Sequence, residues 1–175
     1  MPVMFHKKTL PSRDDERIAA AVGPFVALEL ELDPVSQIKF VCEAAPSRNA
    51  FWTHERACGF VRGDTVFVAT GLTPTSLART IAHEFAHIKQ MRLACQTKKV
   101  TQSVAIDERD ARLTEWEIFG DLPRRATVDE VLAYVRQRHQ KLLREKFAPR
   151  LRQMAENYAA RLPSGGLRIS EIEYR

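Results

Sequence analysis

The stretch that organises this 175-residue chain covers residues 73–91 and reads TPTSLARTIAHEFAHIKQM. Thr73 followed by Pro74 is typical of a helix start, because threonine caps helix N-termini and proline is tolerated in the first turn. The apolar residues that follow recur at intervals of three or four, which places their side chains on one helical face. They are Leu77, Ile81, Phe85 and Ile88. We therefore expect a helix that runs to about Met91 and buries this face.

The same stretch contains the motif HExxH, formed by residues 83–87. His83 and His87 are four residues apart, so on a helix both imidazoles lie on one face and can reach a single ion. Catalytic zinc binds neutral imidazole nitrogens and keeps one position open for water. Glu84 lies between the two histidines and the apolar face, where it can take a proton from that water. The motif indicates a zinc-dependent hydrolase, most simply a peptidase; the alternative is two surface histidines that bracket a glutamate by chance.

A third zinc ligand must come from elsewhere, because catalytic zinc usually has three protein ligands. The longer motif HExxHxxGxxH is absent, since Gln90 and Leu93 occupy the places of its glycine and last histidine. The metzincin class is therefore excluded.

The next expected helix, at about residues 103–119, supplies the candidates for this ligand. Glu108 shares its face with apolar residues, and a carboxylate there is costly unless it is paired or bound to a metal. Those neighbours are Val104, Ala105, Ala111 and Phe119. We predict Glu108 as the third ligand, with Asp107 as the second choice and an ion pair of Glu108 with Arg112 or another basic side chain as the structural alternative.

The remaining pattern predicts an α+β fold in a single domain of residues 1–175. We expect a helix at 12–22, strands at 25–32 and 38–42, and a hairpin of 59–61 with 65–68 that turns at Gly63. Thr127 and Glu130 form a capping box for a helix to about Phe147. A last helix is expected between Pro149 and Pro163. Strands that precede helices favour a small, mostly antiparallel sheet beside the HExxH helix, the third-ligand helix and the C-terminal helices.

The C-terminal third carries the whole positive charge excess. Residues 1–123 contain 15 Lys and Arg against 16 Asp and Glu, a balance of −1, whereas residues 124–175 contain 12 against 6, a balance of +6. Such a basic helical portion can contact nucleic acid, although basic residues on amphipathic helices are more often a solvated face. The aromatic residues that a single-strand binder would use are few here, among them Tyr134, Phe147 and Tyr158.

Cysteine usage and hydropathy favour a cytoplasmic protein. Cys42, Cys58 and Cys95 are odd in number and form no CxxC pair, so we expect reduced and mostly buried thiols. Residues 1–17 lack the apolar core of a signal peptide. No apolar run approaches the length that spans a bilayer, so we expect no membrane partner.

Residues 57–123 resemble the ImmA/IrrE type of HExxH peptidase, a compact gluzincin-like family. The resemblance lies in the segments ACGFVRGDTVFVATGLT, RTIAHEFAHIKQ and IDERDARLTEWEIFGDLP. Family members typically have a hairpin, a helix ending in a sequence like AHELGH, and a downstream Glu-x-x-Ala that supplies the third ligand. Here Glu108 and Ala111 match the last motif. The resemblance implies an intracellular zinc peptidase, often acting on a regulatory protein, with His83, His87 and Glu108 as ligands and Glu84 as base.

The chain departs from this family at two positions. Ala86 replaces a frequent glycine, which is harmless in a helix. Arg112 stands where Asn or Asp is common, and in such sites a polar group often steadies a ligand histidine. Either another residue does this here, or the position of Glu108 in the alignment is wrong.

Other interpretations stay open at this point. A SprT-like, DNA-associated zinc protease would use a further histidine as ligand, for which the chain offers His139. A non-catalytic module could bind nucleic acid or another partner through its basic helices. In the peptidase interpretation an extended peptide could add to the hairpin edge. The donor that stabilises the oxyanion would come from His54, Tyr134 or Tyr158.

Overall fold

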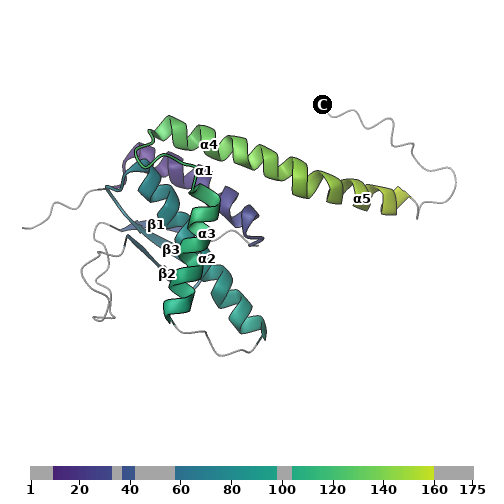
Figure 1. Cartoon of the computed structure of the whole chain (residues 1–175), viewed down its shortest axis with the longest axis horizontal. Helices are drawn as coiled ribbons and strands as arrows, with labels where there is room; N and C mark the ends of the chain where they lie inside the picture. Colours follow the sequence, from purple (N-terminus) through teal and green to yellow (C-terminus); the bar gives the residue numbers. More distant parts are fainter. Residues whose placement is uncertain (1–9, 33–36, 42–57, 98–103, 160–175) are drawn as a thin grey trace, which may run out of the picture. The chain divides into compact units, whose positions relative to one another are not determined.

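The computed structural model describes residues 10–32, 37–41, 58–97 and 104–159. Contacts divide the chain into two compact units, Met1–Arg136 and Gln137–Arg175. The predicted α+β class is confirmed: in the first unit, helices pack beside a small three-stranded sheet (Figure 1).

The first helix, α1, spans Arg13–Glu29 and begins with a capping box. The Ser12 side chain accepts from the Asp15 backbone N–H at 3.0 Å, and the Asp15 carboxylate accepts from the Ser12 N–H at 2.9 Å. These bonds satisfy two N–H groups that helix geometry leaves without partners. The start of the helix is therefore as expected at Ser12.

The predicted strand at residues 25–32 is wrong, because α1 continues to Glu29 and Leu30 caps its C-terminus. Val26, Leu28, Leu30 and Leu32 alternate as in a strand, but Val22, Phe25 and Val26 also continue the helical face that begins at Ile18, and all of that face is buried. Pro24 has no N–H to donate to the Ala20 carbonyl, so one hydrogen bond of the helix is missing there, and both residues are exposed. The free energy gained by burying the helical face exceeds the free energy that the proline costs the helix.

Three strands form the sheet: β1 at Gln37–Val41, β2 at Gly59–Arg62 and β3 at Thr65–Ala69. Their order is β1-β3-β2, with β2 antiparallel to β3 and β1 parallel to β3. The predicted hairpin is confirmed, and Gly63 at its turn has φ +60°, a conformation that favours glycine. The described sheet is thus mixed, since one of its two strand pairs is parallel.

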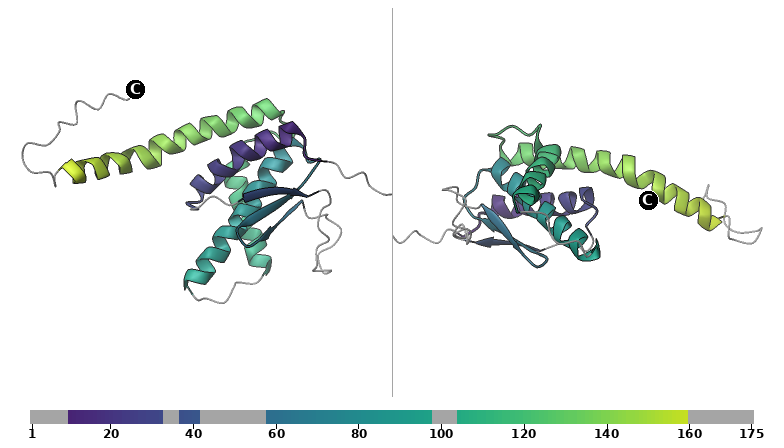
Figure 2. Two further views of the ribbon diagram at one scale, coloured as in Figure 1. Left: turned by 180° about the vertical axis from the view of Figure 1, so that it is seen from behind. Right: turned by 60° about the horizontal axis from the view of Figure 1, so that its bottom comes forward.

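The HExxH helix, α2, spans Pro74–Thr97 and lies at the centre of the first unit, in contact with α1, α3, β2 and β3 (Figure 2). The Thr73 hydroxyl accepts from the Ser76 N–H at 3.3 Å, which confirms the predicted cap. The predicted apolar face is also confirmed, because Leu77, Ile81, Phe85 and Ile88 are fully buried. The hairpin turn is tied to this helix by Arg92, which donates to Asp64 at 3.0 Å.

Helix α3 spans Val104–Phe119 and packs along α2. Helix α4, at Val128–Leu142, starts at the predicted capping box, where the Glu130 carboxylate accepts from the Thr127 N–H at 2.7 Å. It continues into a π-helical turn, η1, at Leu143–Phe147, and then into α5 at Ala148–Ala159. The helix expected to reach about Phe147 thus stays helical to that residue, while the last helix begins at Ala148, one residue before Pro149, with no break between the two.

Two sequence expectations concern the surface. Cys58 and Cys95 are exposed, so the expectation of buried thiols is wrong for both, while Cys42 lies outside the described residues. No helix in the described part of the chain combines the length and apolarity required to cross a bilayer.

Candidate metal centre

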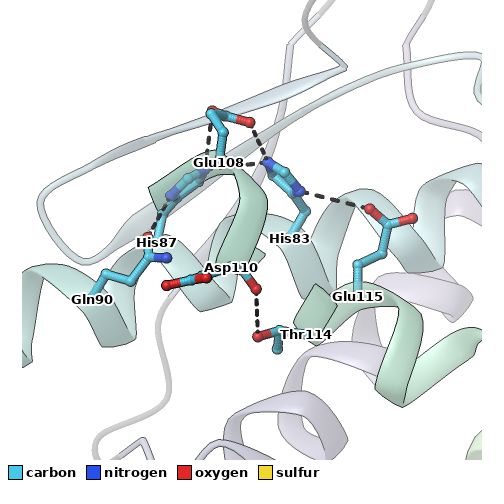
Figure 3. Close-up of polar contacts among 7 residues, drawn as sticks. All are labelled: His83, His87, Gln90, Glu108, Asp110, Thr114 and Glu115. Carbon is cyan, nitrogen blue, oxygen red and sulfur yellow. Dashed lines mark hydrogen bonds and ion pairs between the residues drawn. The ribbon is translucent and has the colours of Figure 1, made fainter. Parts of the chain in front are cut away.

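The two histidines of the motif point toward each other and toward α3 (Figure 3). The Nε2 atoms of His83 and His87 are 3.2 Å apart. The Glu108 carboxylate spans both rings, with Oε2 3.3 Å from His83 Nε2 and Oε1 3.4 Å from His87 Nε2. Ligand atoms of these three residues all lie within 4.8 Å of one another. The predicted trio of His83, His87 and Glu108 is therefore brought together and can hold a metal ion.

Local structure explains why these three groups meet. The histidines are one turn apart on α2, as their spacing requires. Glu108 lies in the first turns of α3, and Ala111 of the same helix is fully buried, which keeps the two helices close. The side chain of Asp107, the second choice, is outside the described part of the structure. Among the described residues, Glu108 contacts the two histidines and forms no ion pair with Arg112.

Each histidine is oriented by a second polar group on its other nitrogen. Nδ1 of His87 lies 2.8 Å from the Gln90 amide oxygen, and Nδ1 of His83 lies 3.6 Å from a Glu115 carboxylate oxygen. The Gln90 oxygen and the Glu115 carboxylate are acceptors, and this arrangement favours the tautomers with hydrogen on Nδ1 and a lone pair on Nε2.

The resulting donor set fits a cation. Two imidazole lone pairs and a carboxylate converge on one point, and three acceptors repel one another unless a positive charge lies between them. Burial lowers the pKa of His83, but its hydrogen bond with Glu115 and the nearby carboxylates of Glu84 and Glu108 raise it by more, so the pKa is raised overall. The site thus attracts positive charge, whether a proton or a metal ion.

Glu84 is buried beside the histidines, with 6% of its surface exposed. Burial, aided by the negative charge of Glu108, raises the pKa of Glu84 to about 7, against the opposing effect of His83. A carboxylate with a pKa near neutrality can accept and then release a proton near physiological pH.

Gly59 is a site residue that the sequence did not reveal. A Cβ atom added there would lie 3.0 Å from Oε1 of Glu84 and 2.8 Å from Cγ2 of Thr80. The backbone of β2 therefore lies directly against the Glu84 side chain, and only glycine leaves this space open. This close approach depends on the packing of β2 against α2, which no local sequence signal reports.

The three oxyanion-donor candidates are only partly placed. His54 and the side chain of Tyr158 lie outside the described residues. The Tyr134 hydroxyl donates to the Ile118 carbonyl at 2.8 Å. Ile118 is ten residues beyond Glu108 on α3, a rise of about 15 Å along the helix. The Tyr134 hydroxyl is therefore engaged away from the metal ligands.

Comparisons with known proteins found no matching family model, curated protein or solved structure for this chain.

Proposed function

We propose that this protein is a zinc-dependent peptidase that hydrolyses peptide bonds with Glu84 as general base. One observation carries the proposal: two imidazole nitrogens and a carboxylate converge within 4.8 Å, and a buried carboxylate of raised pKa adjoins them. Two histidines and one carboxylate are a ligand set typical of catalytic zinc. The resemblance to ImmA/IrrE-type peptidases in residues 57–123 favours the same activity.

His83, His87 and Glu108 would hold the zinc ion, and Gln90 and Glu115 would keep the imidazoles in the tautomer that exposes Nε2. When bound, zinc supplies a Lewis acid that polarises a carbonyl group and lowers the pKa of water. Glu84 takes a proton from the attacking water molecule while the water oxygen forms its bond to the carbonyl carbon. Glu84 then passes this proton to the nitrogen of the leaving amine as the carbon–nitrogen bond breaks.

A peptide substrate is favoured over other acyl compounds by the position of β2. It is an edge strand among the described strands, and its residue Gly59 lies against Glu84. An extended peptide can pair with such an edge through backbone hydrogen bonds, which would bring one carbonyl group to the metal. The cytoplasmic location and a regulatory protein as substrate stay predictions.

The test uses the full chain loaded with zinc, a casein substrate and a peptide library. Glu84→Gln keeps all three proposed ligands, so it should bind zinc as the wild type does and lose cleavage. His87→Ala should lose both zinc and cleavage. Glu117→Gln makes the same chemical change on an exposed residue of α3 and should alter neither. Full cleavage by Glu84→Gln would rule out Glu84 as base.

The alternatives predict other results in the same test. A non-catalytic binding module would bind zinc and show no cleavage in the wild type. A SprT-like protease that used His139 would keep its zinc in Glu108→Ala and lose it in His139→Ala. The contacts of Glu108 with both histidines favour the opposite outcome.

A further inference from the structure

The second compact unit presents a continuous apolar stripe on its helix. Leu143, Phe147, Leu151 and Met154 follow one another at intervals of four, four and three residues across η1 and α5, which places them on one face. Leu143, Leu151 and Met154 are 44%, 62% and 61% exposed. Exposed leucine and methionine in a row indicate a surface that binds something apolar.

The charges of this helix are ordered around the stripe. Viewed down the helix axis, Lys146 and Arg150 border one edge of the stripe, whereas Arg144 and Arg152 lie beyond the other edge. Glu145 and Glu156 lie opposite the stripe. The wider π turn of η1 alters the angles but not this order. Residues 137–159 carry six Lys and Arg against two Glu, a balance of +4.

We propose that this helix binds the surface of an anionic phospholipid bilayer. It would lie in the plane of the interface with Leu143, Leu151 and Met154 among the acyl chains. Lysine and arginine beside an apolar stripe extend their aliphatic stems along it and place their charges among the lipid phosphates. Glutamates on the opposite face then point to water. The expectation of no membrane partner rested on the absence of an apolar run long enough to cross a bilayer. A helix that lies on the bilayer surface does not need such a run, so that expectation does not apply to this surface.

Two other occupants fit this arrangement less well. A helix that binds nucleic acid places its basic residues at the centre of the contact face, because they neutralise phosphates, whereas here the centre is apolar. A second copy of the helix packed on the stripe would bring the basic edges of both copies together, and like charges beside such a seam repel. The order of charges thus selects the lipid surface. This inference is independent of the metal centre.

The test is sedimentation of the full chain with vesicles of phosphatidylcholine that contain about 30% phosphatidylglycerol, a strongly anionic surface. Binding should weaken with added salt and with pure phosphatidylcholine vesicles. The double variant Leu151→Glu/Met154→Glu should lose affinity by on the order of 10-fold or more, because it removes two apolar side chains from the interface. Both residues are exposed, and circular dichroism would check that the helix is retained.

A matched control adds the same two charges without removing an apolar side chain. Gln153→Glu/Asn157→Glu changes two polar residues that bond to each other at 3.3 Å, on the flank that carries Lys146 and Arg150, and it should lose clearly less affinity. Equal loss in both double variants would show that charge alone drives binding and would overturn the proposal. So would the absence of vesicle binding. Tight binding of duplex DNA that both double variants weaken equally, without vesicle binding, would assign the surface to nucleic acid instead.

Discussion

A Cβ atom at Gly59 would lie 3.0 Å from Oε1 of Glu84, so the edge strand β2 and the proposed general base share one confined space. Gly59→Ala should push the Glu84 carboxylate from its position. A misplacement of about 1 Å can cost on the order of 100-fold in rate. We therefore expect kcat to fall by about that factor while one zinc ion per chain is retained.

The added methyl group also meets Cγ2 of Thr80 at 2.8 Å, so Gly59→Ala could act by straining the fold instead. Gly59→Ala/Thr80→Ala removes that second contact and serves as the control. It should recover thermal stability but not kcat. Recovery of kcat in the double variant would show that Gly59 serves packing and not the position of Glu84.

The acceptors on Nδ1 of the histidines should matter for metal affinity. Gln90→Ala and Glu115→Ala each leave one imidazole free to rotate and to change tautomer, and loss of such an outer partner typically lowers metal affinity by about 10–100-fold. Zinc competition with a chelator measures this affinity. Thr114→Ala is the control, because the Thr114 hydroxyl bonds only within α3, to the Asp110 carbonyl at 3.0 Å. Unchanged affinity in both test variants would contradict the orienting role.

The metal-free protein should lose stability as the pH rises. Glu84 has a pKa of about 7 in the folded protein, against an ordinary value of 4.5. Between these values the folded state binds more protons than the unfolded state, so the free energy of unfolding falls with pH, by on the order of 3 kcal/mol for this group. The raised pKa of His83 adds a fall of the same sign at higher pH. Urea unfolding at several pH values measures this fall.

Glu84→Gln identifies the source of this pH dependence, because it removes the titrating group and should flatten the fall below pH 7. Saturating zinc should reverse the trend, since its ligands must be deprotonated and its binding strengthens as the pH rises. An equal fall in the wild type and in Glu84→Gln would show that another group is responsible.

Arg79 should stabilise the junction of α2 and α3. Its Nη2 donates to the carbonyls of Phe119 at 3.1 Å and Leu122 at 3.2 Å, and its guanidinium lies 5.6 Å from the centre of the Trp116 ring. Arg79→Met keeps the aliphatic stem and removes both bonds, so the free energy of unfolding should fall by about 2 kcal/mol. Zinc affinity should stay near the wild-type value, because Glu108 lies at the other end of α3. A large loss of zinc without loss of stability would contradict this assignment.

The sequence predicted those parts of the site that one helix determines by itself. The spacing of His83 and His87 fixes their common face, and the capping residues with the buried stripe locate α2. Glu108 was also predicted, from its place on an apolar helical face; its side chain is 47% exposed, so its contacts with the histidines and not burial define its position. Gln90 could have been found by the same reasoning, since it lies three residues after His87 on the same helix. Glu115 lies seven residues, about two turns, after Glu108 on α3 and could have been found likewise.

The predictions that were wrong or missing concern features that depend on contacts between segments distant in the sequence. Residues 25–32 fit both a strand and a helix, and only packing against other elements decides between these patterns. The role of Gly59 likewise depends on how closely β2 approaches α2. The exposure of Cys58 and Cys95 shows the same limit, because residue type alone does not determine burial.

The most direct test of the central claim is the metal content and ligand set of the purified full chain, measured by elemental analysis and zinc X-ray absorption. We predict one zinc ion per chain with two imidazole nitrogens at about 2.0–2.1 Å and a carboxylate oxygen. The imidazole signal should disappear with the zinc in His87→Ala. A chain that stays metal-free after zinc loading, or that binds zinc without imidazole ligands, would contradict the claim.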